Sequence, residues 1–300
     1  MNMAERTRDE LQALADSVGT AWWHSIDLGQ GVVTPGTKPV ATMEAEIAQL
    51  DLGDLTGKTV LDIGAWDGAF SFECERRGAA RVVALDHFIW SVDLDAQQDY
   101  LAACAADGTA PRPWDEVPSV WKPDELPGKR GFDAAHEALG SKVEAVVADF
   151  SHMDLSTLGT FDLVLYLGVL YHLPDPYGSL QRVATVSRDL AIVETEMLVV
   201  PGADHYGVCE FLAADDLGRD PTNWWVPNRT ALVGMLRAAG FADVTMPPAP
   251  VATQPPAKDR RQRLRDAAFL VETGQEVPFP PVDPVRYRGV AHARKSPPAP

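Results

Sequence analysis

Apolar runs of strand length alternate with stretches of helical spacing along most of this chain of 300 residues. The runs predict buried strands at 59–63, 81–86, 142–148, 161–167, 189–196, 242–246 and 286–294. Helical spacing predicts helices at 69–77, 131–140 and 228–239, and another helix that begins near 175. This alternation is typical of an α/β domain.

The chain before the first of these strands differs from the rest. An amphipathic helix is expected within 1–20, with Leu11, Leu14 and Val18 on one stripe, and a second helix at about 42–50. We therefore expect an N-terminal cap at 1–55, a main domain at 56–295 and a tail at 296–300. Two inserts interrupt the main domain, at about 87–130 and 197–226. The first contains a Pro-rich stretch with two tryptophans, which favours an ordered lid.

The stretch 59–68 predicts a buried strand that ends in a glycine turn and leads directly into a helix. Gly64 and Gly68 bracket the turn, where a backbone without Cβ atoms can approach a ligand. The next strand ends on Asp86, whose carboxylate is placed to accept both ribose hydroxyls of an adenosine. Strand, turn, helix, strand and acid together predict a nucleotide-type binding unit.

Three cofactor classes compete for this unit. The glycine pattern of dinucleotide folds is broken, because its second glycine is Trp66. The triplet at 57–59 suggests a P-loop, but it precedes the strand, and Leu52 stands where the first glycine of that motif belongs. S-adenosylmethionine carries no phosphate and needs an acid near its amino group, a glycine turn and an acid at its ribose. Asp62, the turn at 64–68 and Asp86 satisfy that requirement.

The segment 61–68 resembles motif I of the class I S-adenosylmethionine-dependent methyltransferases, with Trp66 at the middle glycine position. The segment 161–175 resembles their fourth strand and the loop that follows it. The segments 22–29 and 220–228 are similar to the subfamily named for wobble-uridine 5-oxyacetic acid methyltransferases of tRNA, many of whose members act on small molecules. The resemblance covers roughly residues 20–295. It implies a Rossmann-like sheet of seven mostly parallel strands, the last one antiparallel.

The resemblance also implies the residues that bind the cofactor. Asp149 resembles the acid that accepts the adenine amino group, beside an apolar ring contact from Phe150; capping of the next helix is the alternative role for Asp149. The expected set of cofactor-binding residues is Asp62, Gly64, Ala65, Trp66, Gly68, Asp86, His87, Asp149, Phe150 and Leu167.

The acceptor side is expected to be aromatic, because all eight tryptophans lie outside the predicted core strands. Simple packing of the cap and inserts is the alternative role for these rings. If the acceptor is a hydroxyl, it needs a base, and His172 in the loop after the fourth strand is the first candidate and His24 the second. A structural histidine is the alternative for His172. The expected acceptor-contacting residues are Trp22, Trp23, Tyr166, Tyr171, Glu194, Asn223, Trp224 and Trp225.

Charge and composition limit the kinds of acceptor, metal site and cellular location that are expected. The net charge is −17, from 43 acids against 26 bases, which argues against a nucleic-acid acceptor, although the run at 258–265 is basic. Three separated cysteines indicate neither a disulfide framework nor a zinc site, and the acids at 215–220 are more typical of a solvated loop than of a metal site. With no apolar run of membrane-spanning length and no signal-peptide pattern at the start, we expect a cytoplasmic location without membrane contact.

The sequence therefore predicts an enzyme that uses S-adenosylmethionine to methylate a small natural-product acceptor, and the atom expected to receive the methyl group is oxygen. A tRNA wobble-uridine methyl or carboxymethyl transferase is one alternative. Carboxymethyl transfer requires a cation beside the extra carboxylate, and the sequence alone does not place one. A non-catalytic cofactor-binding module is the other alternative. The oligomeric state is left open.

Overall fold

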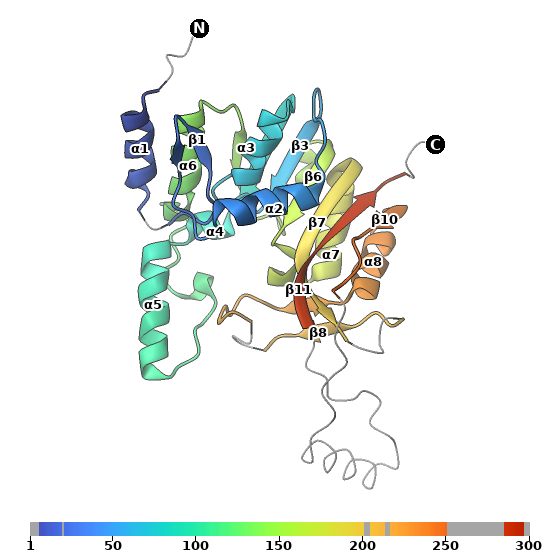
Figure 1. Cartoon of the computed structure of the whole chain (residues 1–300). Helices are drawn as coiled ribbons and strands as arrows, with labels where there is room; N and C mark the ends of the chain where they lie inside the picture. Colours follow the sequence, from blue (N-terminus) through green and yellow to red (C-terminus); the bar gives the residue numbers. More distant parts are fainter. Residues whose placement is uncertain (1–5, 20, 201–204, 214–216, 251–284, 297–300) are drawn as a thin grey trace.

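The computed structural model describes residues 6–19, 21–200, 205–213, 217–250 and 285–296. The basic run at 258–265 lies outside the described residues. Helices and strands alternate along the chain as the hydrophobic pattern predicts, and Figure 1 shows the helices arranged around one central sheet. Within the described part of the chain, every helix is too short or too polar to cross a bilayer.

The central sheet has seven strands in the order β10-β11-β7-β6-β3-β4-β5. Strand β11 is antiparallel to both of its neighbours, and the pairs formed by β3, β4, β5, β6 and β7 are all parallel. This arrangement confirms the predicted seven-stranded, mostly parallel sheet with an antiparallel last strand. The strands are β3 (Thr59–Ile63), β4 (Arg81–Asp86), β5 (Glu144–Val147), β6 (Phe161–Leu167), β7 (Ser187–Val199), β10 (Asp243–Thr245) and β11 (Val285–Arg294).

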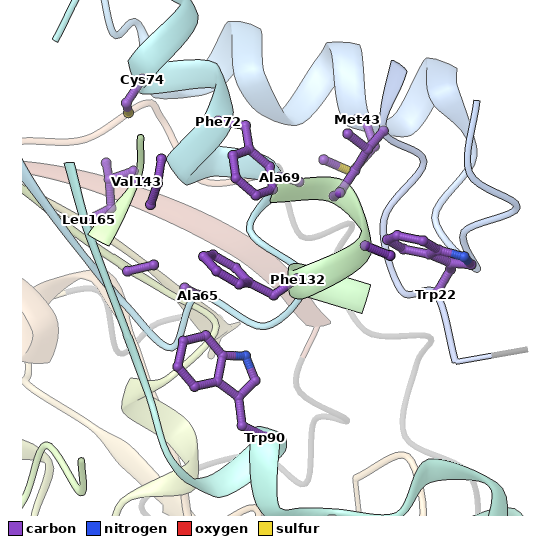
Figure 2. Packing of buried hydrophobic residues seen from close by; sticks show 14 of the residues in the cluster. Trp22, Met43, Ala65, Ala69, Phe72, Cys74, Trp90, Phe132, Val143 and Leu165 are labelled. Carbon is purple, nitrogen blue, oxygen red and sulfur yellow. The ribbon is translucent and has the colours of Figure 1, made fainter. Parts of the chain in front are cut away.

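Two hydrophobic clusters, one for each face of the sheet, form the core. Along β3, Val60 packs into the first cluster, whereas Leu61 and Ile63 pack into the second, because successive side chains of a strand point to opposite faces. Burial on both faces explains why the strands read as continuous apolar runs. Figure 2 shows part of the first cluster, in which the rings of Phe72, Trp90 and Phe132 pack beside small residues.

The helices cover this sheet, and several begin at side chains that cap their free backbone N–H groups. Asp93, Asp175 and Asn228 each accept a hydrogen bond from the first turn of the helix that follows. The main helices are α3 (Ala69–Arg76), α5 (Leu94–Asp107), α6 (Arg130–Leu139), α7 (Pro176–Val186) and α8 (Arg229–Ala238).

The N-terminal segment packs onto the first cluster through Leu11, Ala15 and Trp22. It comprises α1 (Arg8–Ser17), the hairpin of β1 (Asp27–Gly29) and β2 (Val32–Val33), and α2 (Val40–Leu50). Helix α1 begins with a capping box between Thr7 and Glu10, which fixes its start. The predicted amphipathic helix is therefore present, with Leu11 and Val18 buried.

The two inserts differ in detail from the expectation. The first is more helical than its Pro-rich sequence suggested, because α4 (Phe88–Ser91) and α5 precede the short 3-10 turns η1 (Trp114–Glu116) and η2 (Pro127–Lys129). The second starts later than expected, since β7 continues to Val199 beside β11; it contains the hairpin of β8 (Cys209–Phe211) and β9 (Trp225–Pro227). Two further 3-10 turns, η3 (Leu155–Thr157) and η4 (Leu170–His172), follow β5 and β6.

Candidate active site

A cavity of about 1130 Å³ lies where β3, β4 and β6 end. The turn after β3, the acid at the end of β4, the segment after β5 and η4 line it, together with residues of the N-terminal segment and of both inserts. In open α/β folds the carboxyl ends of the strands are where ligands bind. The topology therefore brings together segments that are far apart in the sequence.

The turn after β3 has a left-handed backbone at several positions. Gly64 has φ +79°, and a Cβ there would lie 2.5 Å from Cγ2 of Val169, so glycine is required both by conformation and by space. Trp66, at the middle glycine position of the motif, also has a positive φ, of +50°. Its ring stacks on Trp23 with 4.8 Å between centroids and 9° between planes. The residue that breaks the glycine pattern thus joins the turn to the N-terminal segment.

Two buried carboxyl groups face the cavity from the strand ends. Asp86 accepts hydrogen bonds from the backbone N–H of Trp66 at 3.0 Å and of Ile89 at 3.2 Å, and burial raises its pKa to about 7. Asp62 accepts a hydrogen bond from the hydroxyl of Ser71 at 2.6 Å, and burial raises its pKa to about 6. Both groups are poised for a ligand that donates hydrogen bonds or carries positive charge.

Asp149, after β5, is a third acid on the cavity wall. Burial raises its pKa, but hydrogen bonds from His152 at 2.6 Å and from the N–H of Ser151 at 2.7 Å outweigh burial, and the pKa is lowered overall. Asp149 is therefore ionised at neutral pH. The adjacent Phe150 lines the cavity as well.

His24 reaches the cavity from the N-terminal segment and is held by Asp67 in the turn after β3. One carboxylate oxygen of Asp67 contacts Nδ1 of His24, and the other accepts the N–H of Trp23 at 3.1 Å and of His24 at 2.8 Å. Both His24 and Asp67 are buried. No local pattern in the sequence links Asp67 to the N-terminal segment, because its partners lie more than 40 positions away in the chain.

His172, in η4, is linked to a carboxylate through an intervening hydroxyl, whereas His24 contacts its carboxylate directly. Its Nδ1 lies 2.8 Å from the hydroxyl of Thr222, which donates to a carboxylate oxygen of Asp220 at 2.6 Å. Because that hydroxyl donates to Asp220, it accepts from His172, so the ring proton is on Nδ1 and Nε2 has a free lone pair. Burial lowers the pKa of His172, against the opposing effect of Asp220. The ring is therefore neutral at physiological pH.

Arg288 on β11 is a cation that no motif in the sequence marks. Its guanidinium forms a two-pronged ion pair with Glu194 on β7 and donates to the hydroxyl of Tyr171 at 2.9 Å. Lys38 also lines the cavity and pairs with Glu46 at 2.8 Å. Among the described residues, these two side chains are the Lys and Arg groups on the cavity wall, and each is neutralised by a neighbouring acid.

Comparison with known proteins identifies the family. A family model described as "Methyltransferase domain" matches residues 41–246, which is more than half of the chain. The chain belongs to this methyltransferase family. Its cofactor is S-adenosylmethionine, as the motif I resemblance implies.

Relatives of this methyltransferase include tRNA U34 carboxymethyltransferases. The protein of that name from Pseudomonas savastanoi pv. phaseolicola is 28% identical over 193 residues, covering 64% of this chain and 47% of the relative. The one from Aeromonas salmonicida is 31% identical over 114 residues, covering 38% of this chain and 34% of the relative. This chain thus spans about half or less of the length of the curated relatives it matches.

Among solved structures, the N-terminal domain of EvdMO1, crystallised in the presence of SAH and D-fucose, has a similar fold. The TM-score is 0.54 at 18% sequence identity, and the match covers 96% of this chain and 97% of the other. The similarity covers nearly the whole chain and supports the class I methyltransferase fold.

Most of the cofactor-binding residues expected for this methyltransferase lie on the cavity wall. Ala65 and Gly68 do not: Ala65 is buried in the first cluster, and Gly68 packs against Phe72 and Phe132 at the start of α3. The expected residues on the wall are Asp62, Gly64, Trp66, Asp86, His87, Asp149, Phe150 and Leu167.

The expected acceptor-contacting residues divide into two groups. Trp23, Tyr171, Glu194 and Trp224 line the cavity. Trp22 lies instead in the first cluster, where Figure 2 shows it among other buried side chains. Its Nε1 donates a hydrogen bond to the carbonyl of Ala15 at 3.0 Å. Its prediction as a cavity residue is corrected by this packing role.

Three more residues of that set are placed away from the cavity wall. Tyr166 is fully buried in the second cluster, because the adjacent Leu167 faces the cavity and neighbouring side chains of a strand point to opposite sides. The amide of Asn223 donates to the carbonyl of Leu217 at 2.8 Å, and the indole of Trp225 donates to the carbonyl of Pro174 at 3.0 Å. These bonds stabilise the second insert, which is a structural role.

Proposed function

We propose that this methyltransferase transfers the methyl group of S-adenosylmethionine to a hydroxyl of a small natural-product molecule. The observation that carries the proposal is the cavity itself, whose wall combines the residues expected to bind the cofactor with residues of the N-terminal segment and of both inserts. The buried His24 and the half-buried His172 both lie on the wall of this cavity. Its aromatic wall includes Trp23, Trp114 and Trp224. Such a volume suits a small acceptor beside the cofactor.

The residues on the wall fit the cofactor. S-adenosylmethionine, when bound, supplies an electrophilic methyl group. We assign Asp86 to the ribose hydroxyls, Asp62 to the amino group, and Asp149 with Phe150 to the adenine. The turn that begins at Gly64, which lines the cavity, is assigned to the carboxylate and ribose of the cofactor. Each assignment pairs an acceptor or apolar surface of the protein with the matching part of the cofactor.

The two histidines support a hydroxyl acceptor. An alcohol keeps its proton at neutral pH and reacts faster when a neutral base takes that proton as the new bond forms. Nδ1 of His24 contacts Asp67 and Nδ1 of His172 contacts Thr222, so in each ring Nε2 is the nitrogen left to accept a proton from the acceptor. We assign Trp23, Tyr171, Glu194 and Trp224 to the wall that surrounds the acceptor.

The charges argue for a small acceptor over tRNA. A protein that binds many phosphates presents unpaired cations, whereas Lys38 and Arg288 are both paired with acids here, and the whole chain has a charge of −17. One observation favours the alternative of carboxymethyl transfer to tRNA. Lys38 and Arg288 lie on the cavity wall, and a cation is what the extra carboxylate of that cofactor requires. Some relatives are also named tRNA U34 carboxymethyltransferase. The test must therefore include both acceptors.

The test measures S-adenosylhomocysteine release by the purified protein with a panel of small alcohols, phenols, sugars and carboxylates, and separately with unmodified tRNA. We expect turnover with a hydroxyl compound and none with tRNA. Turnover with tRNA, or only with carboxylated S-adenosylmethionine, would contradict the proposal. Calorimetric binding of the cofactor without turnover on any acceptor would favour the non-catalytic module.

A further inference from the structure

Asp67 makes an unusual set of contacts for a residue of the cofactor turn. It is 1% exposed, and it faces the N-terminal segment, where one oxygen accepts two backbone N–H groups and the other contacts Nδ1 of His24. The carboxylate thereby fixes both the backbone and the ring of His24. No cofactor role explains these contacts.

The contacts determine which nitrogen of His24 carries the proton. An ionised carboxylate can only accept hydrogen bonds, so Nδ1 must donate to it and Nε2 keeps its lone pair. The ring is further confined by edge contacts with Phe70 at 5.4 Å and with Trp66 at 6.3 Å between centroids. His24 lines the cavity. Asp67 therefore prepares His24 to accept a proton there.

We propose that His24 is the general base of the methyl transfer and that Asp67 is the residue that positions it. As the acceptor oxygen bonds to the methyl carbon, its O–H bond breaks and the proton passes to Nε2 of His24, while the electron pair of the broken C–S bond stays on sulfur. The imidazolium that forms is paired with the carboxylate of Asp67. This inference rests on the proposed hydroxyl acceptor.

His172 is less suited to this step. The group that contacts its Nδ1 is the neutral hydroxyl of Thr222, and the carboxylate of Asp220 lies one hydrogen bond further away. A directly hydrogen-bonded carboxylate stabilises a developing imidazolium more than a hydroxyl does. We assign His172 to a hydrogen bond that orients the acceptor.

The substitution Asp67→Asn tests the positioning role with little change in shape. The asparagine oxygen is needed by the two backbone N–H groups, so its NH₂ group must face Nδ1 of His24. Nδ1 must then accept, and the ring proton moves to Nε2. The variant should keep the fold but invert the tautomer, which removes the base.

The tautomer can be read by NMR of the protein labelled with ¹⁵N-histidine and saturated with S-adenosylhomocysteine. The signals of His24 are those lost in His24→Gln. We expect a protonated Nδ1 and a free Nε2 in the wild type and the reverse in Asp67→Asn. The matched control Asp220→Asn should shift the signals of His172 and leave those of His24 in place. A wild-type His24 with its proton on Nε2 would overturn the inference, whether or not the variant folds.

Turnover with the hydroxyl acceptor found by screening completes the test. His24→Gln and Asp67→Asn should each lower kcat by about 10²–10⁴-fold, as loss of a general base does, with cofactor affinity unchanged. A His24→Gln enzyme within a few-fold of wild-type kcat would defeat the inference but leave the proposed function intact. The expected tautomers together with no turnover on any hydroxyl compound would instead defeat the proposed function.

Discussion

The assignment of Asp86 to the cofactor ribose makes cofactor affinity depend on pH. Burial raises the pKa of this carboxyl group to about 7 in the ligand-free protein. The ionised form accepts hydrogen bonds from the ribose hydroxyls in addition to those from two backbone N–H groups, whereas the protonated form has an O–H group that competes for the same positions. The ligand must therefore displace a proton when it binds below pH 7.

The magnitude follows from the position of the pKa. One pH unit below it, about one molecule in ten has an ionised Asp86, which corresponds to about 1.4 kcal/mol and to roughly tenfold weaker binding. Affinity should rise with pH up to about 7 and level off above it. Asp62, with a pKa of about 6, adds to the effect only at lower pH. The slope between about pH 6 and pH 7 thus reports mainly on Asp86.

Calorimetric titration with S-adenosylhomocysteine measures this slope without turnover. The matched variant Asp86→Asn has nearly the same shape but a side chain that cannot ionise. Its affinity for S-adenosylhomocysteine should therefore be lower than that of the wild type at pH 8 and almost independent of pH. Loss of a charge-assisted hydrogen bond costs about 1.5–3 kcal/mol, or tenfold and more in the dissociation constant. A flat wild-type profile, or an equal slope in the variant, would refute the role given to Asp86.

Three further predictions concern stability and selectivity. Gly64→Ala should lower stability by about 1–3 kcal/mol, because the residue has a positive φ and its Cβ would meet Val169; a calorimetric Tm equal to that of the wild type would contradict this. The free energy of unfolding of the wild type, relative to Asp86→Asn, should increase as pH falls from about 7 to 4, because folding raises the pKa of Asp86 and the folded state binds the extra proton; urea unfolding measures it. Glu194→Gln should leave Arg288 with only the weaker pairing to Glu196 at 3.4 Å, and it should strengthen binding of small carboxylates several-fold, measured by calorimetry. The control Asp189→Asn, which removes a surface partner of Arg294 on the same strand, should leave that binding unchanged.

The sequence by itself determined the parts of this protein that depend on local pattern. Buried strands read as apolar runs because both faces of the sheet are covered, and the glycine turn reads as such because few residues adopt its left-handed backbone. Asp86 could be placed at the cavity because parallel neighbouring strands end at the same edge of the sheet. These local signals were enough to predict the fold, the cofactor and most of the residues that line the cavity where the cofactor is expected.

Tertiary structure decided which side chains meet across long stretches of chain. Nothing in the local pattern pairs Asp67 with His24, or Arg288 with Glu194, because these partners are 43 and 94 positions apart. It also decided that Trp22 and Tyr166 pack in the core, since the direction of a side chain depends on which neighbouring element covers it. Local sequence specifies the backbone of each element, but the chemistry of the cavity depends on how distant elements pack.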